Sequence, residues 1–149
     1  YVRIGRQLRR AAGLLRSTRG AVVVEFALIA PALLAMLFGV LQLGLGMQNY
    51  NALRSISADV ARHAVVIYQT ANKLSTSQLQ AYARTVASAP PYGLQADRLI
   101  ATVDLAPTQR VTGAREFTVR LQYDVPSFLG VIGINSIPID YSRPIFVIP

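Results

Sequence analysis

The residues that could support chemistry are few in this chain, and they are far apart in the sequence. Its 149 residues include seven Asp or Glu, one His and no Cys. Four aspartates are spread through the second half with no paired spacing typical of acid–base catalysis: Asp97, Asp104, Asp124 and Asp140. No Ser-His-Asp or Cys-His arrangement and no phosphate-binding glycine loop is recognisable. The sequence therefore predicts no catalytic residue, metal site or cofactor, and it favours a protein that is not an enzyme.

One acidic residue has unusual surroundings. Glu25 lies five residues after Gly20 and directly before an apolar run, residues 26–47, in which Gln42 is the only plainly polar side chain. A charged side chain at the centre of a bilayer is assigned ~2.5–3.5 kcal/mol or more, and less near an interface. An unpaired Glu25 is therefore a liability, which calls for a counter-charge or for a position at the headgroup level.

The apolar run is long enough to cross a membrane as a helix. It has 22 residues, and a spanning helix needs roughly 20 at a rise of ~1.5 Å each. Pro31 is tolerated in such a helix because neighbouring groups re-satisfy the carbonyl that it frees. A buried core helix would be shorter, and a secretory signal peptide would have an apolar core of only ~7–15 residues. Ala35 and Gly39 form a small-xxx-small pair that could let another helix approach closely.

The charge distribution predicts the orientation of this helix. Residues 1–20 carry six Arg and no acid, whereas residues 21–149 carry nine Lys or Arg against seven Asp or Glu. By the positive-inside rule, the basic arm stays in the cytoplasm and the chain after the run is exported. Because the exported part is nearly neutral, a basic groove for nucleic acid is not expected.

After Met47 the pattern becomes amphipathic without an intervening loop. Apolar residues recur at spacings of three and four: Leu53, Ile56, Val60, Ala64, Ile67, Ala71 and Leu74. This spacing predicts that the helix continues to about Asn72. We expect its apolar stripe to pack on the protein's own domain rather than on a partner, and His63 to be an ordinary surface residue.

The remaining chain predicts a short helix and a small sheet. The sequence Ser-Thr-Ser-Gln at 75–78 fits a capping box at the start of a helix. Alternating apolar residues at 99–105 and 117–125 predict two half-buried antiparallel strands. A third run, 137–141, alternates in the same way. The fold class is therefore α+β, with a long N-terminal helix, a short second helix and a small antiparallel β-meander.

The third run contains one proline and is followed by another, and an apolar stretch precedes it. Pro138 and Pro144 predict an edge strand or a frayed one, because proline donates no ladder hydrogen bond. The stretch SFLGVIGINS, residues 127–136, predicts an apolar loop with a short helical turn.

The stretch Gly20-Ala-Val-Val-Val-Glu25-Phe26 resembles the processing motif of prepilins of the type IV pilus superfamily. These precursors carry a short basic leader ending in Gly, then four apolar residues, a Glu at the fifth mature position and a hydrophobic or aromatic residue. Pro31 and the Leu- and Gly-rich helix resemble the TadE-like branch, the minor pilins or pseudopilins of the tight-adherence (Tad/Flp) pilus. VRLQYDVPSF is similar to a Tyr-containing strand of that branch. The major Flp pilin is much shorter, and a TadG-like protein is usually longer.

The resemblance implies a pilin-like α+β fold in three parts. Residues 1–20 would be a basic cytoplasmic leader, residues 21–47 a transmembrane helix, and residues 48–149 an exported domain. A membrane-embedded prepilin peptidase would cleave between Gly20 and Ala21, where a residue without Cβ lets the backbone be extended and closely approached. An uncleaved signal anchor, with Gly20 merely at the helix start, is the other interpretation.

The resemblance also suggests a role for Glu25. Cleavage creates the amine of Ala21, with a reference pKa of ~7.7–8.0. In packed subunits this amine could pair with Glu25 of a neighbour and set their register, because a missing partner is costly in low dielectric. Phe26 is the neighbouring motif residue. Alternatively, Glu25 lies at the headgroup level or interacts favourably with the helix N-terminus.

The function expected from this resemblance is structural. The protein would be a minor pilin that takes part in Tad pilus initiation or assembly and thereby in surface adhesion. It would be a single-pass protein of the bacterial inner membrane, with a cytoplasmic N-terminus and a periplasmic domain. Its partners would be the prepilin peptidase, other Tad pilins, the inner-membrane assembly platform and lipid, but no nucleic acid or small-molecule substrate. The alternative is an uncleaved single-pass protein with a periplasmic binding or sensor domain.

Overall fold

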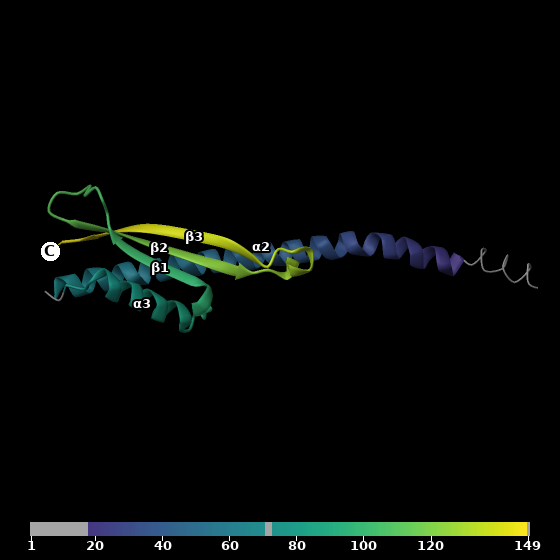
Figure 1. Ribbon diagram of the computed structural model, residues 1–149, viewed down its shortest axis with the longest axis horizontal. Coiled ribbons are helices and arrows are strands. Elements are labelled where there is room, and N and C mark those ends of the chain that lie inside the picture. The colour runs from purple at the N-terminus through teal and green to yellow at the C-terminus, as the bar shows by residue number, and fades with distance from the viewer. Residues whose placement is uncertain (1–17, 71–72, 149) are drawn as a thin grey trace, which may run out of the picture. The chain divides into compact units, whose positions relative to one another are not determined.

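The computed structural model describes residues 18–70 and 73–148 (Figure 1). The chain divides into two compact units, Tyr1–Val40 and Leu41–Pro149, called here the N-terminal and the C-terminal unit. The helix α2, Thr18–Gln69, has 52 residues and contributes to both. Its end at Gln69 is slightly earlier than the expected end near Asn72, a residue that lies outside the described part of the chain.

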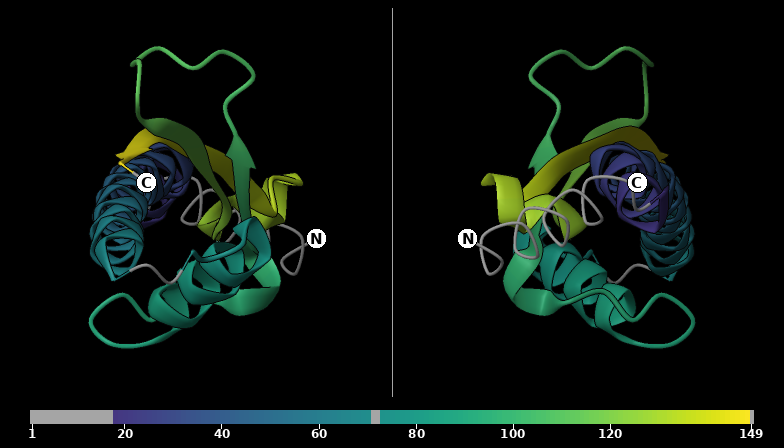
Figure 2. Two further views of the ribbon diagram at one scale, coloured as in Figure 1. Left: turned by 90° about the vertical axis from the view of Figure 1, so that its left-hand side faces the viewer. Right: turned by 90° about the vertical axis from the view of Figure 1, so that its right-hand side faces the viewer.

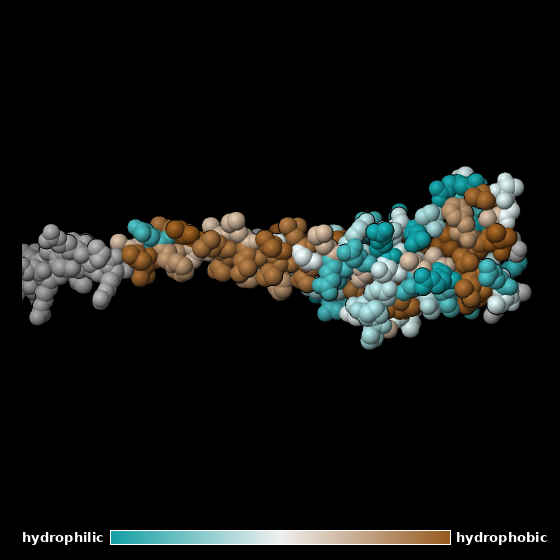
Figure 3. Space-filling model, turned by 180° about the vertical axis from the view of Figure 1, so that it is seen from behind, coloured by the Kyte–Doolittle hydropathy of each residue, from teal (hydrophilic) through white to brown (hydrophobic). Residues whose placement is uncertain are grey.

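The described part of the N-terminal unit, residues 18–40, is helical throughout. Pro31 lies within α2, as the sequence predicted, and does not end it. Twelve large apolar side chains of this unit are exposed, and Figure 3 shows their helix as an almost continuous hydrophobic surface. They are Val22, Val23, Val24, Phe26, Leu28, Ile29, Leu33, Leu34, Met36, Leu37, Phe38 and Val40. A helix that is apolar on all sides is typical of a membrane span rather than of a water-exposed surface.

The second helix, α3, spans Thr76–Ser88 and begins with the capping box that the sequence predicted. The backbone N–H of Gln78 donates to Ser75 Oγ at 3.3 Å, and the backbone N–H of Ser75 donates to Gln78 Oε1 at 2.9 Å. Two N–H groups that the helix itself leaves unpaired are therefore satisfied.

The sheet is an antiparallel meander in the order β1-β2-β3, as expected. Its strands are β1 Leu99–Leu105, β2 Arg115–Pro126 and β3 Ser136–Val147. A 3₁₀ helix, η1 Ala96–Arg98, precedes β1, and a second one, η2 Phe128–Ile132, connects β2 to β3. The predicted helical turn between the last two strands is thus confirmed.

Strand β3 has twelve residues and is longer than the run 137–141 that the sequence indicated. It pairs with β2 along its whole length, so of the two predicted alternatives it is the edge strand and not the frayed one. Pro138 and Pro144 are six residues apart, so their nitrogens lie on the same side of the strand. The ladder is compatible with both because an edge strand has one side that donates to no neighbour.

The core of the C-terminal unit lies between one face of the sheet and the two helices, α3 and the outer part of α2 (Figure 2). Leu53, Ile56, Val60 and Ala64 are fully buried, which confirms that the stripe packs on the protein's own domain. In the last turn Tyr68 is buried and Ile67 only half-buried, because the Tyr68 ring packs 6.0 Å from that of Phe117.

The position of His63 differs from the sequence expectation. It is half-buried rather than simply on the surface. Its ring stacks on Tyr82 of α3, with a centroid distance of 3.7 Å and an interplanar angle of 8°. Nearby, the Tyr92 hydroxyl donates to Asp59 Oδ2 at 2.8 Å and so links the chain after α3 to α2. Burial, and then the Asp59 carboxylate, raise the pKa of Tyr92.

Candidate functional site

The predicted site residues all lie on the part of α2 that belongs to the N-terminal unit. They are Gly20, Ala21, Glu25, Phe26, Ala35 and Gly39. Five of them are exposed and Gly39 is half-exposed. The helix forms here because Ala- and Leu-rich sequence has high helix propensity and no residue breaks it. One continuous helix therefore positions the whole candidate site.

The bond between Gly20 and Ala21 lies within helical residues. A Cβ placed on Gly20 would meet no atom within 4 Å, so the absence of a side chain serves no packing purpose there. Glycine destabilises a helix by ~1 kcal/mol relative to Ala. It therefore makes local unwinding easier at the one bond that a peptidase would have to bind in an extended form.

Glu25 lies four residues after Ala21, and the two therefore share one face of α2. Residues spaced in this way have Cβ atoms ~5–6 Å apart. Val22, Leu28 and Ile29, which occupy the neighbouring helix positions, expose 63%, 76% and 56% of their surface. Within the described residues Glu25 makes no ion pair. The arrangement presents a carboxylate, one turn from residue 21, on a surface that is otherwise apolar.

Ala35 is exposed and Gly39 is half-exposed. A Cβ on Gly39 would meet no atom within 4 Å. The small-xxx-small pair is therefore not used for packing within the described residues. The two small residues would allow the backbone of a second helix to approach closely here.

Gln42 is a structurally important residue that the sequence analysis noted but did not interpret. It lies in α2 near the start of the C-terminal unit and is only 5% exposed. Its Nε2 donates to the carbonyl of Pro126 at 3.2 Å, and its Oε1 accepts from the N–H of Phe128 at 3.0 Å. Its contact could have been anticipated from the sequence, because Gln42 is the only plainly polar side chain of the apolar run and a buried polar group requires a hydrogen-bond partner.

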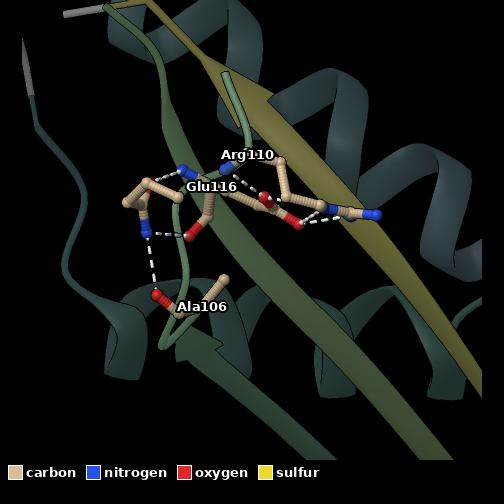
Figure 4. Close-up of polar contacts among 4 residues, drawn as sticks. Ala106, Arg110 and Glu116 are labelled. Carbon is tan, nitrogen blue, oxygen red and sulfur yellow. Dashed lines mark hydrogen bonds and ion pairs between the residues drawn. The ribbon is translucent and has the colours of Figure 1, made fainter. Parts of the chain in front are cut away.

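A second polar cluster holds the loop between β1 and β2 (Figure 4). Glu116 is 3% exposed. Arg110 Nε donates to both of its carboxylate oxygens, at 2.9 and 3.0 Å, and Arg110 Nη2 donates to Oε1. Gln109 Nε2 donates to the carbonyl of Ala106 at 2.8 Å, and Gln109 Oε1 accepts from the Glu116 N–H at 2.6 Å.

This cluster has a structural explanation. Arg110, through its hydrogen bonds, lowers the pKa of Glu116 and keeps the carboxylate charged. The guanidinium carbon of Arg110 also lies 5.5 Å from the centroid of the Phe146 ring, opposite Glu116 in the ladder. The sequence indicated only a polar connection here, because pairing across six residues depends on how the loop folds. In residues 18–70 and 73–148 no three His, Cys, Asp or Glu side chains are grouped to hold a metal ion.

Residues 20–62 match the family model described as "TadE-like protein". This part of the chain is TadE-like. The match begins at Gly20, includes all six predicted site residues and ends within α2, so the sheet lies outside it. It confirms the resemblance predicted from the Gly20–Phe26 motif. No curated protein and no solved structure matched the chain.

Helix α2 has the length and composition of a membrane span. The segment Gly20–Gln69 is the one helix in the described residues that is long and apolar enough to cross a membrane. None of its most apolar stretch is buried. A long, apolar and exposed N-terminal helix is compatible with a membrane-anchored pilus protein.

Proposed function

We propose that this protein is a minor pilin of a Tad-type pilus, cleaved after Gly20 by a prepilin peptidase and active in pilus initiation or assembly. It would be anchored in the bacterial inner membrane with a cytoplasmic N-terminus and an exported C-terminal unit. Its partners would be the peptidase, other Tad pilins and the assembly platform. It would have no catalytic role.

The observation that supports this proposal most is the shared face of Ala21 and Glu25 in a TadE-like helix. The carboxylate is exposed among apolar side chains, and no positive group pairs with it in the described chain. Cleavage would place an α-amine on Ala21. The amine of one subunit and Glu25 of a neighbour could then neutralise each other when two such helices pack in register.

Processing is the direct test of the proposal. The full chain is coexpressed with its cognate prepilin peptidase, and the mature N-terminus is determined by sequencing and intact mass. We expect Ala21 to be the first residue. Gly20→Val should block cleavage, because the added side chain hinders the close approach of the peptidase to the backbone at that bond.

A matched glycine provides the control. Gly39→Val introduces the same side chain into the same helix, where a Cβ also meets no atom within 4 Å, and cleavage should continue. Full-length protein that persists beside a peptidase active on its own pilin substrate would contradict the proposal. That outcome would favour an uncleaved membrane protein with a binding or sensor domain.

A further inference from the structure

The loop between β2 and β3, residues 127–135, is fixed to α2 by Gln42. This segment is called the η2 loop here. The Gln42 amide bonds to the Pro126 carbonyl and to the Phe128 N–H at 3.2 and 3.0 Å. The loop is closed at its base, where the Ser127 N–H donates to the Asn135 carbonyl at 3.2 Å. The start of the loop must therefore lie at the level of Gln42 along the helix.

That level is inside the apolar run of α2. Gln42 precedes Met47, the last residue of the run, by five residues, which is ~7.5 Å at ~1.5 Å per residue. Polar residues follow Met47 immediately, at Gln48, Asn49 and Asn51. If the run spans a bilayer, its exported end lies near residues 47–48. The η2 loop then begins ~7.5 Å on the hydrocarbon side of that boundary.

The chemistry of the η2 loop fits this depth. The chain contains no charged residue between Asp124 and Asp140, and none on α2 between Glu25 and Arg54. Phe128 and Ile134 of the loop are 53% and 42% exposed. Apolar side chains of α2 in the same unit are exposed at this level as well: Leu41 47%, Leu43 71% and Met47 69%.

The Gln42 amide supplies an independent argument. An unpaired amide is costly in hydrocarbon, and backbone groups there must also find partners within the protein. Gln42 donates one N–H to the carbonyl of Pro126, directly before the loop, and its Oε1 accepts from the N–H of Phe128 within the loop. A contact of this kind is suited to a place that water does not reach.

We propose that the η2 loop inserts the exposed side chains of Phe128 and Ile134 into the exported leaflet of the bilayer, beside the transmembrane helix. The occupant of this surface is lipid at the boundary of headgroups and acyl chains, where interfacial elements are typically buried by ~5–10 Å. Two attachments, the helix and the loop, would then hold the C-terminal unit against the membrane. The inference rests on the membrane placement of α2 and not on cleavage or pilus assembly.

The absence of native cysteine allows a depth measurement. Ile134→Cys is labelled with an environment-sensitive fluorophore in the full chain, reconstituted at one protein per lipid nanodisc. Nitroxide-labelled phospholipids serve as the quencher. Leu43→Cys is the positive control. Val111→Cys, 49% exposed in the loop at the opposite end of the meander, is the negative control (Figure 1).

We expect several-fold stronger quenching of the Ile134 probe than of the Val111 probe. An Ile134 probe no more quenched than the Val111 probe, while the Leu43 probe is quenched, overturns the inference and leaves the membrane placement intact. An unquenched Leu43 probe overturns both the inference and the membrane placement of α2. An Ile134 probe that stays unquenched, and whose emission shifts to the blue only when several copies share a disc, assigns the surface to a second chain and also overturns the inference. If Ile134→Cys does not fold, the adjacent exposed Asn135→Cys gives the same measurement.

Discussion

At the scale of single residues, the two glutamates of this chain illustrate two ways of handling a carboxylate. Glu116 is buried and holds its charge because Arg110 donates several hydrogen bonds to it. Glu25 is exposed on an apolar helix and has no ion-pair partner in the described residues. The Glu116 carboxylate is paired within the chain, whereas the Glu25 carboxylate needs lipid headgroups, water or another subunit as its partner.

The prediction for Glu25 follows from this difference. Glu25→Gln keeps the size and shape of the side chain and removes its charge. Insertion and cleavage after Gly20 should persist, because a neutral amide is easier to place in a bilayer than a carboxylate. Recovery in sheared pili should fall ~10-fold or more, because the Ala21 amine would lose its counter-charge in a water-poor helix bundle.

The measurement compares processing and pilus co-purification in one strain. Asp124→Asn, which makes the same chemical change at an exposed position on β2, is the control and should assemble normally. Normal recovery of Glu25→Gln in pili would show that Glu25 is not the registry charge.

Glu116 predicts a pH dependence of stability. Its pKa in the folded protein is lowered by Arg110. The resulting stabilisation is complete at neutral pH, declines as the pH falls below ~4.3, the reference value for unfolded glutamate, and is lost below the folded pKa. Glu116→Gln should therefore lower the free energy of unfolding at pH 7, and the difference from the parent should shrink as the solution is acidified.

Denaturant unfolding of the full chain in detergent micelles, measured from pH 7 to pH 3, tests this dependence. Asp104→Asn, an exposed carboxylate on β1, is the comparison and should change the unfolding free energy little at any pH. A difference for Glu116→Gln that stays constant down to pH 3 would contradict the role assigned to the Arg110 contact.

At the scale of elements, α2 has different surroundings along its length. Residues 18–40 expose large apolar side chains, whereas from Gln42 onward one face of the helix packs within the C-terminal unit. The composition changes after Met47, and the sequence therefore predicts that the exported domain starts at residue 48. Contacts within the chain divide it between Val40 and Leu41. The apolar run of the helix therefore ends at Met47, several residues after the packing of the C-terminal unit begins at Leu41.

This offset predicts the behaviour of two fragments. A fragment of residues 49–149 should fold as a mixed helix and sheet protein, because the buried stripe that begins at Leu53 is complete. A fragment of residues 41–149 should be more stable by ~1–3 kcal/mol, because it keeps the two hydrogen bonds of Gln42, to the Pro126 carbonyl and the Phe128 N–H. Both are compared by circular dichroism and urea unfolding in the same mild detergent. An unfolded shorter fragment, or equal stability of the two, would contradict this view.

At the scale of the whole molecule, the proposed topology can be tested by labelling. Val111→Cys in the C-terminal unit should react with a membrane-impermeant maleimide in intact spheroplasts, because the positive-inside rule exports everything after the apolar run. Gln7→Cys in the basic arm should react only after lysis, in a strain that lacks the peptidase. The reverse pattern would show that the chain inserts in the opposite orientation.

Several features of this protein were determined by its sequence alone. The capping box at Ser75, the alternation in β1 and β2 and the apolar run of α2 were all predicted and are present in the structure. The TadE-like segment was predicted from residues 20–26. These features depend on residues close together in the chain, whose spacing determines helix caps, strand faces and membrane compatibility without reference to the rest of the fold.

Other features were decided only by the tertiary structure. The partners of Gln42 are 84 and 86 residues away, the full length of β3 depends on its pairing with β2, and the sheet buries Tyr68 in preference to Ile67. In each case a residue has several local options of similar energy. The choice among them depends on the strand register and on which helix face meets the sheet, and both are set by packing across the whole unit.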